Sequence, residues 1–294
     1  AENLLIENTV MRNTAGTPPA AGIDFEPNHA HERLKNCVLR QCVTENNGGS
    51  GFDFYLPNLT RASEPVSLRL ENCRSVNDQS GLKITTGNSD EGAVRGTMVF
   101  AGCRFEKARR AGATVARKPA FGLELSFENC VFDGNCGTNA MPDFFLLNRM
   151  EDGWPVGGIR LDGVTVSQSA ARPWIAWQNN TTVADPVMAL TGTVTVERNG
   201  GREIIELTPE WVAKTFPPRF SVRVPRVSGD LAKARVTDRL EGVQALSPLR
   251  VRRVCTYVFY AESGREVTLA GVQTQVGRYE VGTKPLVVRA PSGG

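Results

Sequence analysis

Short apolar segments recur along the first two thirds of the chain and predict stacked strands. In each copy an apolar residue is followed by a variable residue, then Asn or Gly, then mostly Cys, and the copies are 27 to 36 residues apart. This interval suits three short strands and three turns, so the pattern predicts a right-handed parallel β-helix of about seven coils. The copies are residues 6–9, 34–37, 70–73, 100–103, 127–130, 161–164 and 190–193.

The third and fourth positions of this repeat predict a bend and a core column. Asn and Gly tolerate the left-handed conformation that a tight bend requires. The cysteines at the fourth position, Cys37, Cys73, Cys103 and Cys130, would stack inside the helix as small apolar residues. A disulfide from Cys42 to Cys136 or Cys255 is the alternative use of the remaining thiols.

A second strand follows each bend, and its alternation separates an inner from an outer face. The copies are residues 22–26, 51–55, 81–85, 112–116, 143–147 and 173–177. Period-2 alternation places residues such as Ile23 and Phe25 inside. The outer face then carries two columns: Asp24, Asp53, Lys83, Thr114, Phe145 and Trp174 in the first, and Glu26, Tyr55, Thr85, Ala116, Leu147 and Ala176 in the second.

The repeat ends before the C-terminus, which predicts a second domain. The pattern fails over residues 202–220, and Pro217-Pro218 indicates a boundary. We therefore predict a β-helix over residues 1–215 and a small β-sandwich-like domain over residues 216–294, with strands at 220–224, 251–261, 266–272 and 285–290. Helical spacing of apolar residues occurs only in short stretches, at 208–213 and 230–240.

Composition excludes several classes of partner. Of the 294 residues 22% are charged, the net charge is +3, and acids alternate with bases, so we expect neither a nucleic-acid partner nor a membrane surface. No apolar stretch approaches the roughly 20 residues of a membrane helix. Two histidines and no CxxC pair argue against a zinc site. The first residue is not Met and already lies in a predicted strand, which favours a processed or truncated chain.

The outer columns of the second strand contain the candidate chemistry. Asp24, Glu26 and Asp53 are expected on neighbouring positions, with Asp24 and Glu26 about 6.5 to 7 Å apart along one strand, near the lower limit for an inverting glycosidase pair. Crowded carboxylates raise one pKa, which keeps a general acid protonated. Lys83 lies one rung further. The structural alternative is a cross-strand ion pair between Asp53 and Lys83.

Several residues near these acids are candidates for binding a substrate. Aromatic side chains provide stacking surfaces for sugar rings, and a flat ladder of strands suits a long polymer. The histidines belong to a loop beside the acids, where exposed loop residues without a role are the alternative. The candidates are Tyr55, His29, His31, Phe145, Trp174 and Arg117. Trp174 is equally suited to packing the last coils against the C-terminal domain.

The coil pattern over roughly residues 1–200 resembles the pectate-lyase-like β-helix superfamily of polysaccharide lyases and polygalacturonase-type glycoside hydrolases. The resemblance of residues 51–55 and 81–85 to family 9 pectate lyases implies Asp53 as a calcium ligand and Lys83 as the base. A lyase would hold calcium with Asp24, Glu26 and Asp53, since hard cations prefer oxygen ligands. Gly48-Gly49-Ser50 stands where that family has further aspartates. The polygalacturonase resemblance instead implies acids on neighbouring rungs followed by a basic residue.

Charge favours hydrolysis over elimination. A uronate substrate would be repelled by three acids unless a metal neutralised them, whereas hydrolysis of a neutral sugar needs no cofactor. We therefore expect a glycoside hydrolase that acts on a polysaccharide and is secreted, periplasmic or on the cell surface. The alternatives are a calcium-dependent lyase with Lys83 as base and a non-catalytic carbohydrate-binding or adhesive solenoid.

Overall fold

A computed structural model describes the chain over residues 1–87, 93–136, 141–148, 156–170, 172–179, 188–216, 226–229, 234–247, 250–261, 266–276, 279–282 and 286–289. The chain divides into two compact units, one of residues 1–181 and 186–216 and one of residues 182–185 and 217–294. No helix within the described residues is long and apolar enough to cross a membrane. Each unit is described by itself below.

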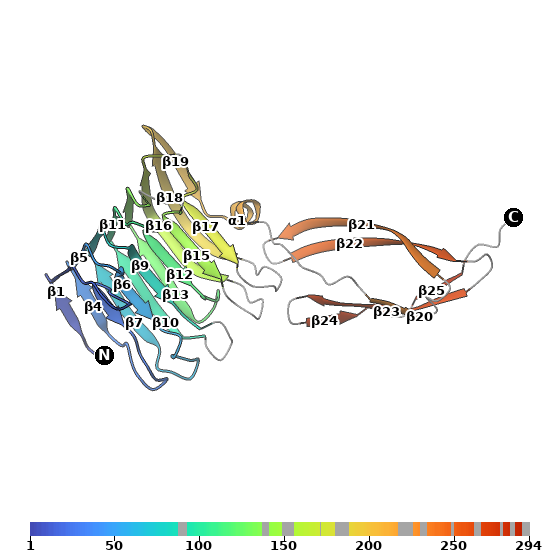
Figure 1. The fold of residues 1–294 in the computed structure, drawn as a ribbon, viewed down its shortest axis with the longest axis horizontal. Helices are drawn as coiled ribbons and strands as arrows, with labels where there is room; N and C mark the ends of the chain where they lie inside the picture. Colours follow the sequence, from blue (N-terminus) through green and yellow to red (C-terminus); the bar gives the residue numbers. More distant parts are fainter. Residues whose placement is uncertain are drawn as a thin grey trace. The chain divides into compact units, whose positions relative to one another are not determined.

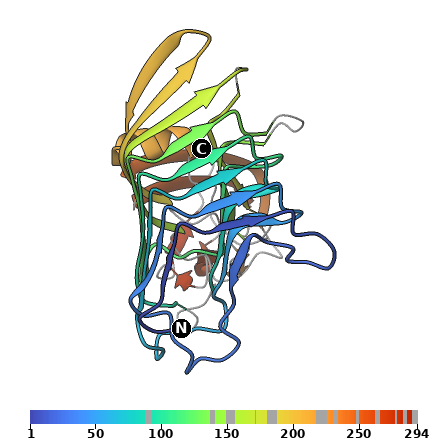
Figure 2. The same ribbon diagram turned by 90° about the vertical axis from the view of Figure 1, so that its left-hand side faces the viewer.

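The first unit is a parallel β-helix of about five full turns. The strands of successive coils lie one behind another when the N-terminal coil faces the viewer (Figure 2). In coil order the first sheet contains β1 (Leu5–Glu7), β4 (Cys37–Arg40), β7 (Val66–Glu71), β10 (Gly96–Ala101) and β13 (Leu123–Glu128). The second contains β2 (Val10–Arg12), β5 (Val43–Glu45), β8 (Arg74–Val76), β11 (Arg104–Glu106) and β14 (Val131–Asp133).

The third sheet presents the predicted outer columns. It contains β3 (Ile23–Phe25), β6 (Ser50–Tyr55), β9 (Ser80–Thr85), β12 (Ala113–Ala116), β15 (Phe144–Asn148) and β17 (Ile175–Asn179), all parallel (Figure 1). Register joins Asp24 to Asp53 and Asp53 to Lys83 on adjacent strands. The predicted neighbours of the first column are therefore confirmed as far as Phe145.

Two longer strands end the coil pattern. β16 (Val156–Gln168) pairs with both β13 and β14 and so joins the first two sheets. β18 (Met188–Arg198) continues it in parallel, but β19 (Gly201–Glu206) then turns back antiparallel. The seven predicted coils are thus about five full turns, a sixth made of β16 and β17, and a seventh that only begins.

The Asn and Gly corners explain how the chain bends between the first two sheets. The residues at the predicted corner position have a positive φ: Asn8 (49°), Asn72 (51°), Gly102 (61°), Asn129 (52°) and Gly163 (65°). These angles lie in the left-handed region, which Asn and Gly adopt with the least strain. The prediction of a left-handed corner is therefore confirmed at these five positions.

Two copies of the repeat were placed in the wrong register. Ile6 lies opposite Leu39 rather than Leu34, because this coil has two left-handed corners five residues apart, at Asn36 (φ 52°) and Gln41 (φ 52°). The sequence pattern matched the first corner, whose Asn36 donates to Asn3 at 3.0 Å. In the last copy Leu190 lies opposite Ile159 rather than Leu161, since two register shifts interrupt the pairing of β16 with β18.

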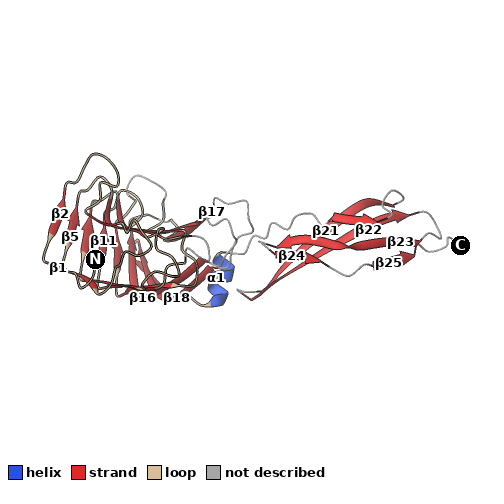
Figure 3. Ribbon diagram, turned by 90° about the horizontal axis from the view of Figure 1, so that it is seen from below, coloured by secondary structure: helices blue, strands red, loops and turns tan. Residues whose placement is uncertain are grey.

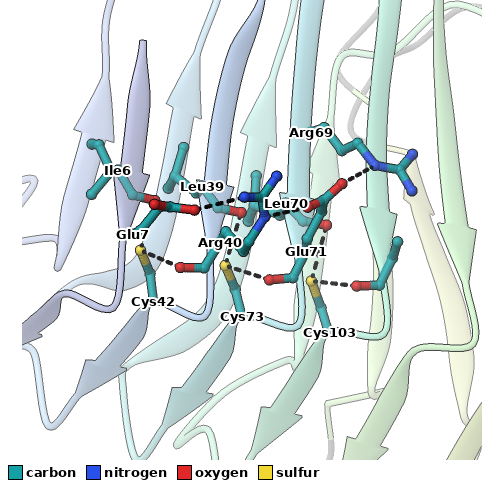
Figure 4. Close-up of polar contacts among 11 residues, drawn as sticks. Ile6, Glu7, Leu39, Arg40, Cys42, Arg69, Leu70, Glu71, Cys73 and Cys103 are labelled. Carbon is teal, nitrogen blue, oxygen red and sulfur yellow. Dashed lines mark hydrogen bonds and ion pairs between the residues drawn. The ribbon is translucent and has the colours of Figure 1, made fainter.

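The cysteine column is real but has a different first member. Cys42, not Cys37, precedes Cys73, Cys103 and Cys130, and each thiol lies within hydrogen-bonding distance of a carbonyl of the preceding coil. Figure 4 shows the first three of these thiols. Cys37 is also buried, opposite Leu68. All the cysteines whose side chains the structure describes, Cys42 and Cys136 included, are free. The disulfide alternative for Cys42 and Cys136 is therefore wrong, and Cys255 lies outside the described side chains.

Stacked aromatic rings fill the interior of the β-helix. Phe100 and Phe127 stack with centroids 4.7 Å apart, and Phe105 and Phe132 with centroids 5.1 Å apart. All four are fully buried. Truncating one such ring to Ala typically costs about 3–5 kcal/mol of unfolding free energy. Burial of these inward-facing rings therefore stabilises the β-helix.

One short helix follows the last coil. Helix α1 (Pro209–Thr215; Figure 3) begins after Thr208. The Thr208 hydroxyl accepts from the Trp211 backbone N–H. A Ser or Thr oxygen at this position satisfies an amide that has no partner in the first turn. The helical spacing noted at 208–213 is therefore confirmed, and this is the one helix in the described residues.

The second unit is built of strands. β20 (Arg226–Gly229), β23 (Glu266–Val276), β24 (Tyr279–Gly282) and β25 (Leu286–Arg289) form one antiparallel sheet, and β21 (Ala234–Ser247) pairs with β22 (Arg250–Ala261). The helical spacing at 230–240 is wrong, because most of that segment is strand β21. The predicted strand at 220–224 lies outside the described residues.

Candidate active site

Four charged residues meet on the outer face of the third sheet, near its N-terminal edge. Asp24 lies on β3, Asp53 on β6 and Lys83 on β9, in consecutive register, and Glu26 directly follows β3. Adjacent rungs are about 4.8 Å apart. The structure therefore brings together all four residues that the sequence analysis assigned to catalysis.

Asp53 is the least accessible of the four although its strand position points outward. Its exposed fraction is 2%. Its Oδ2 accepts from Lys83 Nζ at 3.2 Å, while its Oδ1 is buried without a hydrogen-bond partner. Burial raises the pKa of the Asp53 carboxyl, and the Lys83 ammonium opposes that rise. Asp53 is thus half satisfied, with one oxygen paired and one not.

Asp24 is exposed and has an altered acidity. Burial of part of the carboxyl and the neighbouring charges of Asp53 and Glu26 together raise its pKa from 3.8 to about 6, against a lowering by Lys83. A side-chain hydrogen bond with Glu26 acts in the same direction. A carboxyl with this pKa retains its proton at mildly acidic pH, where an ordinary aspartate does not.

These carboxylates do not form a metal site as they lie. Among the described residues no three Asp, Glu, His or Cys side chains are grouped so as to hold a metal ion. Asp53 commits one oxygen to Lys83. The donor set implied for calcium thus does not fit the arrangement of Asp24, Glu26 and Asp53.

The residues assigned to substrate binding are distributed unevenly. Tyr55 is half-buried on β6, next to the acids. His29 and His31 are exposed in the loop after β3, and their rings stack on each other at 5.4 Å. Phe145 is half-buried in the first column, four rungs from Asp24, or about 19 Å. Together they mark one face from the acids toward the later coils.

Trp174 is not on this face, and its predicted place in the column is wrong. Ala176 lies opposite Phe145, so the sixth strand is shifted by two residues from the predicted alignment. Trp174 is 5% exposed and stacks on Trp211 of helix α1 with centroids 6.1 Å apart. Trp174 therefore packs helix α1 against the last coils, within the first unit, and not against the C-terminal domain as the structural alternative stated.

The two basic residues after β12 differ in environment. Arg117 is half-buried in a left-handed conformation (φ 58°), and its carbonyl accepts from the Thr86 hydroxyl at 2.6 Å. Lys118 is 1% exposed, donates to the carbonyls of Pro119 and Gly157, and has a pKa lowered to about 7 by burial. An adjacent Arg-Lys pair in a loop gives no sequence signal that one ammonium is enclosed.

A buried polar cluster supports the strand that holds Asp53. Asp78 accepts hydrogen bonds from the Thr44 and Ser75 hydroxyls and from Asn47. A Cβ at Gly51, two residues before Asp53, would lie within 2.5 Å of Asp78 and Ser75 oxygens. The glycine that precedes the outward acid is therefore required by this cluster, which the sequence analysis did not identify.

No protein-family model, curated protein or solved structure matches this chain.

Proposed function

We propose that this chain is a carbohydrate-active enzyme, a glycoside hydrolase that cleaves a polysaccharide along the outer face of the third sheet. The observation that supports this is Asp24, an exposed carboxyl whose pKa is raised to about 6 beside two further acids. Perturbed acids clustered on an accessible surface are typical of catalytic sites. The fold is compatible with this role, because stacked strands offer an extended surface to a polymer.

In this proposal Asp24 is the general acid and Glu26 the general base. Asp24 protonates the glycosidic oxygen as the bond to the anomeric carbon breaks, and Glu26 takes a proton from the water that forms the new bond to that carbon. Asp53 and Lys83 act as positioning residues, since the Asp53 carboxylate is buried and the Lys83 ammonium is paired with it.

The lyase alternative is less well supported. An eliminating base must present a free amine, but Lys83 Nζ donates to Asp53. The calcium that would offset three acids has no fitting donor set among the described side chains. A hydrolase acting on a neutral sugar requires neither condition.

One observation favours a non-catalytic carbohydrate-binding or adhesive solenoid instead. The Asp53–Lys83 ion pair at 3.2 Å is the cross-strand contact that a purely structural rung would make. It leaves Asp24 and Glu26 as exposed acids without a described ion pair. This alternative predicts binding without product formation.

The test is product analysis on a panel of neutral and acidic polysaccharides, with and without calcium. We expect new reducing ends without absorbance of an unsaturated uronate near 235 nm, and loss of activity in Asp24→Asn. Asp162→Asn is the matched control, because Asp162 is an exposed acid on the first sheet paired with Arg160. Calcium-dependent absorbance at 235 nm would overturn hydrolysis in favour of elimination, and no product on any substrate would overturn enzymatic function. Substrates of this size also favour secretion or display on the cell surface.

A further inference from the structure

A polar hollow lies at the end of the second sheet, away from the third-sheet acids. Its volume is about 650 Å³, within the range of small-ligand sites. Asp133 on β14, Ser167 on β16 and Glu197 on β18 line it and stand on consecutive rungs in register. The hollow therefore has an acidic column with a hydroxyl at its centre.

The hairpin of β18 and β19 (Figure 1) adds cations to the same hollow. Arg198, Asn199 and Arg202 line it, and Arg202 lies opposite Glu197 across the hairpin. The turn is formed by Asn199 (φ 49°) and Gly200 (φ 78°), as expected for a two-residue hairpin connection. Two guanidinium groups thus face a region that also contains two carboxylates.

These charges are not cancelled within the described part of the chain. None of the ion pairs found there engages Asp133, Glu197, Arg198 or Arg202. Elsewhere on the β-helix, acids and bases on neighbouring rungs do pair, as Arg74 and Glu106 do at 2.5 Å. Ser167 Oγ donates to Glu197 Oε2 at 3.3 Å, and the other donors and acceptors of these unpaired charges are open to a ligand.

One of the two arginines is held in place by a hydrogen bond to a neighbouring side chain. Arg198 Nε donates to Gln168 Oε1 at 2.6 Å, and Gln168 Nε2 donates to the carboxylate of the fully buried Asp143. Asp143 is in turn paired with Arg172 at 2.9 Å. A guanidinium fixed at one nitrogen loses less entropy when its remaining N–H groups bind an anion.

We infer that this hollow binds an anionic sugar, a hexose unit that carries one carboxylate, sulfate or phosphate group. The anionic group is bound by Arg198 and Arg202, because guanidinium donors match planar and tetrahedral oxyanions. The sugar hydroxyls donate to Asp133 and Glu197 and exchange a hydrogen bond with Ser167. This inference does not depend on the proposed hydrolase activity, which lies on a different sheet.

The spacing of the acids favours a polyhydroxy ligand over an amino acid. Asp133 and Glu197 are two rungs apart, or about 9.6 Å along the stack. A single ammonium group can contact one of these carboxylates at hydrogen-bond distance but not both. Several hydroxyl groups around a sugar ring can reach both carboxylates at once.

The experiment is ligand-observed NMR of the full chain with glucuronate, glucose 6-sulfate and glucose 6-phosphate, with glucose as the neutral reference and with lysine as the amino acid. We expect saturable binding of at least one anionic sugar, at least tenfold tighter than glucose. Whichever probe binds tightest identifies the anionic group. Arg202→Gln and Asp133→Asn should each weaken that binding about tenfold or more, whereas Glu203→Gln, the next residue on the same hairpin, should not change it.

The inference is overturned if no anionic sugar binds more tightly than glucose, or if lysine binds more tightly than every anionic sugar. It is also overturned if Arg202→Gln binds as the unmodified chain does. Circular dichroism of each variant separates a lost site from a lost fold. Activity at the third-sheet acids is measured separately, so failure of one proposal leaves the other to be judged on its own result.

Discussion

Charged residues are arranged differently on two outer faces of the same β-helix. On the first three rungs of the first sheet the signs alternate: Arg40 lies between Glu7 and Glu71, at 2.6 and 2.7 Å, and Arg69 adds a second contact to Glu71 at 2.7 Å (Figure 4). On the third sheet Asp24 lies beside Asp53 and near Glu26, with Lys83 as the cation on the next rung.

The difference shows which face is explained by stability alone. Rungs about 4.8 Å apart force neighbouring charges into contact, so a structural column is expected to alternate in sign. Glu7, Arg40 and Glu71 on the first sheet do so, and the hydrogen bonds from Arg40 and Arg69 lower the pKa of Glu71. The third sheet places acid next to acid and raises the pKa of Asp24 to about 6. An arrangement that costs stability favours a functional explanation.

The largest expected effect separates the two faces by activity. If the third sheet is catalytic, Asp24→Asn should lower kcat/KM by 100-fold or more, because an amide cannot donate the proton that a general acid transfers. Arg40→Ala on the first sheet should leave kcat/KM within about twofold. The measurement is the rate of reducing-end release on the best substrate of the panel. Equal effects of the two substitutions would remove the distinction between the faces.

The second effect concerns stability at the buried rung. Lys83→Ala leaves the Asp53 carboxyl buried without its partner, and we expect a loss of about 2 kcal/mol of unfolding free energy. This is less than the loss for a fully enclosed pair, since Lys83 is 40% exposed. Urea denaturation measures it. The double variant Lys83→Ala, Asp53→Asn should recover part of the loss, and no recovery would show that Asp53 does not carry the cost.

The third effect is the dependence of stability on pH. The pKa of Asp24 is raised from 3.8 to about 6 in the folded chain, so its contribution is fully present below pH 4 and is lost as the pH rises through 6. After allowance for screening at an exposed carboxyl, we expect a decrease of about 1 kcal/mol across this window. Asp24→Asn should remove that part of the slope. A slope unchanged in the variant would assign the titration to another group.

The same titration should shape the activity profile. Because the general acid must be protonated, kcat/KM should fall on the alkaline side of a pKa near 6. A rise in kcat/KM above pH 6 would instead indicate that Asp24 acts as a base. The profile is measured over the range in which the fold is stable by circular dichroism.

The smallest expected effect is on the first-sheet ladder, which consists of the ion pairs of Arg40 with Glu7 and Glu71. Arg40→Ala removes contacts between side chains that are 26% to 44% exposed, and such surface pairs contribute little. Its thermal midpoint should fall less than that of Lys83→Ala, and the difference from the unmodified chain should disappear at 1 M salt, where the screening length is about 3 Å. A loss equal to that of Lys83→Ala would show that the ladder is essential to the fold.

Much of the coil architecture could be predicted from local pattern. Asn8, Asn72 and Asn129 mark left-handed corners because few other residues tolerate that conformation. Alternation placed Phe52 and Phe54 inside and Asp53 between them. Register was less secure: two corners five residues apart near Asn36 have similar local sequences, and only hydrogen bonding between coils distinguishes them.

The hollow at the end of the second sheet shows a different limit of prediction from sequence. The Asn199-Gly200 turn is a recognisable hairpin signal, and Asp133, Ser167 and Glu197 are outward residues of strands. Strand β14, which contains Asp133, and its neighbour β11 have three residues each, too few for alternation to be recognised. The column therefore became visible only when the coils were stacked.

The sequence by itself determined the parallel β-helix, its left-handed corners and the charged residues of the third-sheet face, because each depends on short-range pattern and on the period of a strand. Tertiary structure alone decided that Asp53 is enclosed, that Lys83 pairs with it, that Trp174 packs on Trp211 and that Asp24 acquires a pKa near 6. Burial and pairing depend on which residues of other coils come within a few ångströms. That distance is set by register between segments about 30 residues apart, which no local pattern encodes.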